Sequence, residues 1–124
     1  MTIAILVAGA TTVLVAPSAE ARSRTFRAKP SGITCVAQQV GEPTATLRCD
    51  LPFLGRRAVF LRQQGKAQIK AVPRLLHPPH PATLGRGHDA RYGAFTCTSL
   101  RTGVTCRAGN GHGFTVGRSF QLTY

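Results

Sequence analysis

Four cysteines are the residues whose spacing says most about the chemistry of this chain. They occupy positions 35, 49, 97 and 106, and no two of them form a C-x-x-C pair. Zinc and redox sites use closer spacing, whereas an even number of cysteines in a small secreted chain is typical of disulfides. Of the three possible connectivities we favour Cys35 with Cys49 and Cys97 with Cys106, because each pair brackets a segment short enough to fold back as a hairpin. Such loops contribute about 2.5 to 3 kcal/mol each in the chain-entropy model.

Four histidines are the candidate catalytic and metal-binding groups. His112 lies in Gly111-His112-Gly113, where two glycines permit a tight turn that presents the imidazole to a ligand. We expect a structural turn there, with His112 as an active-site residue as the alternative. His77 and His80 flank two prolines, and on a polyproline II segment they would lie about 9 Å apart, too far to share one ion. We therefore expect no metal and no cofactor. The alternative is a small hydrolase or metal-dependent enzyme that combines His112 with His77, His80 or His88.

Acidic residues are too few for most hydrolytic chemistry. Beyond residue 21 the chain contains only Glu42, Asp50 and Asp89, and a paired-carboxylate site needs two of them to converge. Asp50 follows Arg48 and Cys49, and nearby arginines would keep it ionised, so we expect an ion-pair or turn residue. The sequence contains no G-x-S-x-G elbow and no P-loop. These observations predict a protein that is not an enzyme.

Basic residues are the strongest remaining signal. Sixteen Lys and Arg stand against the three acids beyond residue 21, a net charge of +13, and thirteen of the sixteen are Arg. Arginine binds phosphate and carboxylate with paired hydrogen bonds, which predicts a polyanion-binding surface. The candidate residues form an arm just past residue 21 and a central cluster: Arg22, Arg24, Arg27 and Lys29, then Arg56, Arg57, Arg62, Lys66 and Lys70. The alternative is that the charge only keeps the protein soluble.

The expected partner is an anion that an exported protein meets. Anionic polymers of the cell envelope, lipid head groups, an acidic protein and extracellular DNA all qualify. Nucleic acid is the less favoured of these, because aromatic residues are few and are mostly Phe at core-like positions, which does not suit stacking on bases.

The first 21 residues predict export. Residues 1–16 carry no charge and contain two apolar runs, and Ala19-Glu20-Ala21 has the small-residue pattern of a cleavage site. The apolar stretch ends at about 16 residues, short of the roughly 20 that span a bilayer. The basic residue that normally precedes the apolar run is missing, which indicates that translation starts further upstream. We expect a signal peptide over 1–21, one basic domain over 22–124, and a protein that is secreted or held in the cell envelope.

Short β-favouring runs between turn residues predict an all-β domain. No apolar period of 3.6 residues holds over a helix length, although a short helix is an alternative to a strand over 57–62. Residues 73–91 are rich in Pro, Gly and His and predict a loop without ladder pairing. We expect a small disulfide-stapled barrel or sandwich of about six to eight short antiparallel strands.

Two motifs resemble those of an uncharacterised family of small secreted bacterial proteins. The first is Phe26-x-x-Lys29-Pro30-Ser31-Gly32-Ile33-x-Cys35, followed by Arg48-Cys49-Asp50, and the second comprises residues 95–107 and 111–116. The resemblance covers most of the chain beyond residue 21 and implies export and a compact β-rich domain. It implies no activity. Members of the family often carry a further central cysteine pair, which residues 50–96 of this chain do not have.

Overall fold

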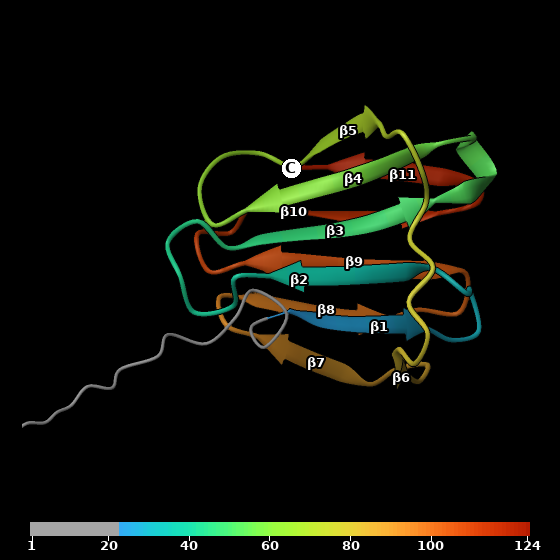
Figure 1. Ribbon diagram of the computed structural model, residues 1–124, viewed down its shortest axis with the longest axis horizontal. Coiled ribbons are helices and arrows are strands. Elements are labelled where there is room, and N and C mark those ends of the chain that lie inside the picture. Colours follow the sequence, from blue (N-terminus) through green and yellow to red (C-terminus); the bar gives the residue numbers. More distant parts are fainter. Residues whose placement is uncertain (1–22) are drawn as a thin grey trace, which may run out of the picture.

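The computed structural model describes residues 23–124, where the regular structure is almost entirely β (Figure 1). In chain order the strands are β1 (Arg24–Ala28), β2 (Thr34–Gln38), β3 (Thr46–Leu51), β4 (Arg57–Arg62), β5 (Gln68–Ala71), β6 (Ala82–Leu84), β7 (Asp89–Tyr92), β8 (Phe95–Ser99), β9 (Gly103–Ala108), β10 (Gly113–Gly117) and β11 (Phe120–Thr123). A single 3-10 turn, η3 (Pro52–Leu54), separates β3 from β4. The expected signal peptide, residues 1–21, and the candidate Arg22 lie outside the described residues.

The strands form two sheets that pack face to face (Figure 1). One sheet has the order β5-β4-β3-β2-β1-β6 and the other β11-β10-β9-β8-β7. Neighbours within each sheet are antiparallel, except that β6 runs parallel to β1. The all-β prediction is confirmed, and of the two expected architectures the molecule has the sandwich, because its strands belong to two separate sheets. Within the described residues no helix is long and apolar enough to cross a membrane.

The prediction of one loop over residues 73–91 is wrong in part. Residues 73–81 do lack strand structure, but Ala82–Leu84 pairs with β1 and Asp89–Tyr92 pairs with β8. The last proline of the segment is Pro81, so the backbone N–H groups beyond it are free to join ladders. These two short strands help to bring the number of strands within residues 23–124 to eleven, above the six to eight expected. Residues 57–62 form a strand and not the alternative short helix.

Both predicted disulfides are confirmed. Cys35 bonds to Cys49 and Cys97 to Cys106, and each bond joins two residues that lie directly opposite one another on adjacent antiparallel strands. All four cysteines are buried in the core between the sheets. Each sheet therefore has a covalent link within its central hairpin, on the side that faces the other sheet.

Alternation along the strands places the core between the two sheets. Leu47, Val59 and Leu61 point inward from one sheet, and Phe95 and Phe114 point inward from the other. At one end the sheets also share a polar contact, because the hydroxyl of the buried Ser99 on β8 donates a hydrogen bond of 2.7 Å to the carbonyl of Lys29. The residues between these inward positions point away from the core, and on the six-stranded sheet they form its outer face.

Candidate polyanion-binding face

The outer face of the six-stranded sheet consists of the strand residues that point away from the core. Register places Arg48 on β3, Phe60 on β4 and Gln68 on β5 in one row across the three strands. Arg62 follows Phe60 by two residues and Lys70 follows Gln68 by two, so both cations point to the same side of the sheet. Cations from three strands therefore surround one half-buried aromatic ring.

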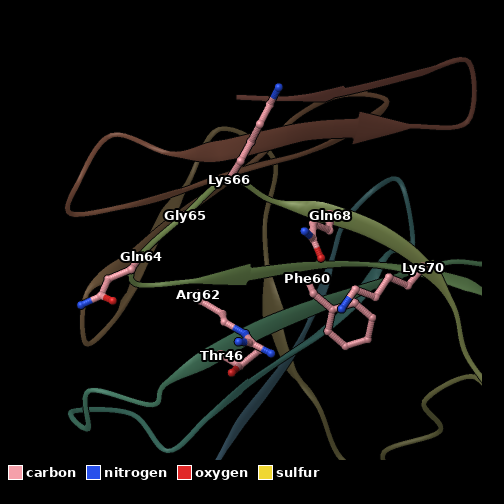
Figure 2. Close-up of a pocket in the computed structure, with 8 residues that line it drawn as sticks. All are labelled: Thr46, Phe60, Arg62, Gln64, Gly65, Lys66, Gln68 and Lys70. Carbon is pink, nitrogen blue, oxygen red and sulfur yellow. The ribbon is translucent and has the colours of Figure 1, made fainter.

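A hollow of about 530 Å³, here called the basic hollow, opens on this face (Figure 2). Its lining comes from β3, β4, β5 and the turn after β4, and comprises Thr46, Phe60, Arg62, Gln64, Gly65, Lys66, Gln68 and Lys70. Figure 2 shows Arg62 beside Thr46 and the Lys70 amino group near Phe60, whereas Lys66 points away from both. Within the described part of the chain the lining contains three cations and no carboxylate, and two of the cations face the hollow.

The Phe60 ring holds two of the neighbouring cations. The Arg48 guanidinium carbon lies 5.8 Å from the ring centroid and the Lys70 ammonium nitrogen 5.9 Å from it. Contacts of this kind contribute about 0.5 to 1 kcal/mol at exposed sites. They restrict two long side chains before any ligand arrives, which lowers the entropy lost on binding.

Asp50 is an ion-pair residue, as expected. One carboxylate oxygen accepts a hydrogen bond of 2.7 Å from the Arg48 Nε, and the other accepts one from the backbone N–H of Leu76. The side chain of Asp50 is only 4 % exposed, so its charge is paired and shielded from the hollow. Among the described residues no ion pair involves Arg62, Lys66 or Lys70, and these charges are available to an external anion.

Residues 73–81, here called the strap, cross the outer face at one end of the strands (yellow in Figure 1). Three hydrogen bonds attach the strap to the sheet. The first is the bond from the Leu76 N–H to Asp50. In the second, Arg48 donates to the carbonyl of Arg74 at 2.8 Å, and in the third, Arg56 donates to the carbonyl of Pro73 at 3.2 Å. A second depression of about 400 Å³, the strap hollow, lies between the strap and β1 and β2.

The structure divides each of the two predicted basic groups. Of the central cluster, Arg62, Lys66 and Lys70 line the basic hollow, but Arg56 and Arg57 lie at the other end of β4. They do not join the same site, because Arg56 precedes the strand and donates to the carbonyl of Pro73, and Arg57 lies three residues from Phe60, so alternation turns it to the opposite face.

Two residues of the predicted basic arm lie beside the strap. Arg27 and Lys29 line the strap hollow together with Asp50 and His77, so this site carries both signs of charge. Arg24 is exposed at the start of β1. The eight candidate basic residues that the structure describes therefore do not form one continuous surface.

The sequence did not single out Phe60 or the glutamines of the basic hollow. Phenylalanines were expected in the core, yet Phe60 is half-buried on the outer face. The sequence of β4 does indicate that Phe60 lies on the outer face. Phe60 is two residues from the polar Arg62, whereas the apolar Val59 and Leu61 are its direct neighbours. Strict alternation of side chains would have placed it with Arg62.

His112 lies in the turn between β9 and β10, and its backbone helps to hold that turn. Its N–H donates a hydrogen bond of 3.0 Å to the Asn110 side chain, and its carbonyl accepts one of 2.8 Å from the N–H of Ala108. The strap, which carries His77 and His80, lies at the other end of the sandwich, and so does the start of β7, which directly follows His88 in the chain (Figure 1). The alternative site that combines His112 with one of them is therefore not assembled. Within residues 23–124 no group of three His, Cys, Asp or Glu side chains is placed to hold a metal ion.

Comparison of the chain with protein-family models, with curated proteins and with solved structures finds no match. The resemblance to a family of small secreted proteins therefore stays a prediction. Function has to be inferred from the outer face of the six-stranded sheet, where unpaired cations meet a concave surface.

Proposed function

We propose that this chain is a non-catalytic binding module, secreted or held in the cell envelope, that engages a polyanion through the basic hollow. The observation that carries the proposal is the lining of that hollow, in which Arg62, Lys66 and Lys70 are accompanied by no carboxylate. A concave site lined by one sign of charge concentrates the local potential and attracts counter-ions of the opposite sign. Arginine adds directional recognition of carboxylate, sulfate or phosphate groups.

The strap hollow is a weaker candidate for the same role. Asp50 contributes to its lining beside Arg27 and Lys29, and Arg27 is already engaged, since its Nε donates to the hydroxyl of Thr34 at 3.2 Å. Neutralised or occupied cations attract an anion less strongly than unpaired ones. We therefore assign the main contact to the basic hollow.

One feature of the sequence and one of the structure support this location. Residues 1–21 have the pattern of a signal peptide, and both disulfides suit an oxidising compartment outside the cytosol. An envelope polymer, lipid head groups and an acidic protein are the anions available there. Nucleic acid is the less favoured partner.

The test compares two variants of equal charge. Arg62→Gln/Lys70→Gln removes two cations of the basic hollow, and Arg91→Gln/Arg107→Gln removes two exposed cations from β7 and β9 on the other sheet. Binding of the purified protein to heparin, to polyphosphate and to phosphatidylglycerol vesicles is measured between about 50 and 200 mM salt, where polyanion binding should weaken steeply. We expect the first variant to lose at least about tenfold in affinity for the anion that binds. The second should lose no more than about twofold.

Two results would overturn the proposal. One is the absence of salt-dependent binding to every polyanion. The other is an equal loss in both variants, which would show that net charge alone, and not the basic hollow, attracts the anion.

A further inference from the structure

We infer that the polyanion is an acidic glycan, bound along a groove that extends well beyond the basic hollow; this inference rests on the proposed function. Two further hollows, of about 440 and 220 Å³, adjoin the basic hollow near the ends of β2, β3 and β4. Thr46 lines all three hollows, Arg62 and Gln64 line the first two, and Thr44 lines the last two. The shared lining residues place the three hollows side by side, and together they are here called the glutamine groove.

Five of the six glutamines in the chain line this groove: Gln38, Gln39, Gln63, Gln64 and Gln68. A glutamine amide carries two donor hydrogens, an acceptor oxygen and no net charge. It therefore suits a ligand group that both donates and accepts, as the hydroxyls of a sugar do. Phosphate and sulfate groups only accept hydrogen bonds when ionised, and cations serve them better.

Two of the five glutamines shape the groove, and three are available to a ligand. Gln39 is hydrogen-bonded to the hydroxyl of Thr44, and Gln63 donates to the carbonyl of Glu42 at 2.6 Å, which connects the turn after β4 to the turn after β2. Within residues 23–124 the side chains of Gln38, Gln64 and Gln68 form no hydrogen bond. All three residues are exposed.

Charge is unevenly distributed along the groove. Among residues 23–124 its cations gather at the end formed by the basic hollow, and the two adjoining hollows are lined by no described charged side chain other than Arg62. A uniformly charged chain such as polyphosphate would leave its charges unmatched at the neutral end. A glycan that carries a carboxylate or sulfate on some units and only hydroxyls on others matches both ends.

The same groove is poorly suited to nucleic acid and to lipid. Its lining includes one aromatic ring, Phe60, which already contacts Arg48 and Lys70, whereas single-stranded nucleic acid is bound by successive rings that stack on bases. The large apolar side chains that are most exposed, Leu122 and Tyr124, belong to the end of the chain at β11 in the other sheet. A bilayer contact at the groove would lack an apolar anchor.

The test uses variants that leave charge unchanged. Gln64→Ala/Gln68→Ala removes two amides of the groove, and Gln121→Ala removes the sixth glutamine, which lies on β11 outside it. Titration calorimetry of the purified protein with polygalacturonate, polyphosphate, neutral dextran and single-stranded oligothymidylate compares the ligand classes, with thermal midpoints as a check of folding. We expect polygalacturonate to bind at least about tenfold more tightly than polyphosphate or oligothymidylate. The double variant should lose about tenfold for polygalacturonate and less than about twofold for polyphosphate, and Gln121→Ala should change neither.

The possible failures are distinguishable. If polyphosphate or oligothymidylate binds as tightly as polygalacturonate, or if the double variant binds polygalacturonate normally, the glycan inference is wrong and the polyanion proposal stands. If dextran binds as well as polygalacturonate, binding does not require negative charge on the glycan, and the inference is also wrong. If no polyanion binds in a salt-dependent way, both proposals fall together.

Discussion

The ring of Phe26 on β1 stacks on the ring of Tyr92 on β7, with centroids 5.0 Å apart and planes only 3° from parallel. The two strands belong to different sheets, so the pair connects the sheets across the core. Phe26 is fully buried, and burial raises the pKa of the Tyr92 hydroxyl above its ordinary value of 10.0. The stacked pair therefore has a consequence for stability at high pH.

Stability should fall at alkaline pH because of Tyr92. Unfolding exposes the hydroxyl and restores its ordinary pKa, so above about pH 10 the unfolded state ionises before the folded state does. The stabilising effect is complete below that pH and is lost as pH rises through the higher pKa of the folded state. Urea denaturation between about pH 8 and pH 11 should show the decline in free energy of unfolding, and Tyr92→Phe should reduce it. Tyr124→Phe is the control, because Tyr124 is exposed and its replacement should leave the decline in place.

Gly113 should not tolerate a side chain. A Cβ atom there would lie 2.3 Å from the carbonyl oxygen of Cys106 and 3.2 Å from the ring of Tyr124. Gly113→Ala forces β9 and β10 apart and should lower the free energy of unfolding by about 1 to 3 kcal/mol. At Gly109 an added Cβ would meet nothing within 4 Å, so Gly109→Ala should change stability by less than about 0.5 kcal/mol. Similar urea midpoints for the two variants would contradict this account.

Both disulfides should contribute to stability in the purified protein. Intact mass under non-reducing conditions should be lower by the mass of about four hydrogens than after reduction, as two bonds require. Replacing Cys35 and Cys49 together by alanine should lower the free energy of unfolding by about 2 to 5 kcal/mol, because the unfolded chain gains freedom. A loss of less than about 1 kcal/mol in the free energy of unfolding would show that the bond contributes little.

Asp50 should hold the strap on the sheet. Asp50→Asn weakens the contacts with Arg48 and with the Leu76 backbone, and we expect a loss of about 1 to 3 kcal/mol in the free energy of unfolding. Limited proteolysis should then cleave within residues 73–81 faster than in the unaltered protein. Asp89→Asn is the matched control, since Asp89 is exposed and accepts one hydrogen bond from the hydroxyl of Thr98. Equal effects of the two changes would mean that the Asp50 contacts do not hold the strap.

The cysteine pairing and the strand content followed from local features of the chain. Cys97 and Cys106 bracket the turn of one hairpin, and Cys35 and Cys49 that of another, so short loops pointed to both bonds. Turn residues and the two-residue period marked most strands for the same reason, since hairpins form between neighbouring segments. Prolines from Pro73 to Pro81 correctly excluded strand structure over that stretch.

The remaining features of the fold depend on contacts between residues that are far apart in the chain. β6 pairs in parallel with β1, a strand far away in the chain, and no local pattern identifies such a partner. The hydrogen bond between Asp50 and the N–H of Leu76 likewise joins residues 26 positions apart.

The candidate site was likewise predicted in part from the sequence and identified in part only from the tertiary structure. Composition and charge alone indicated an anion-binding protein, and Arg62, Lys66 and Lys70 were among the residues named from the sequence. Only the tertiary structure identified Phe60 and the glutamines as residues of the site. Alternation along a strand divides its residues between two faces, but which face is buried depends on where the other sheet packs. That packing turned Val59 and Leu61 inward, and left Phe60 on the outer face between Arg48 and Lys70.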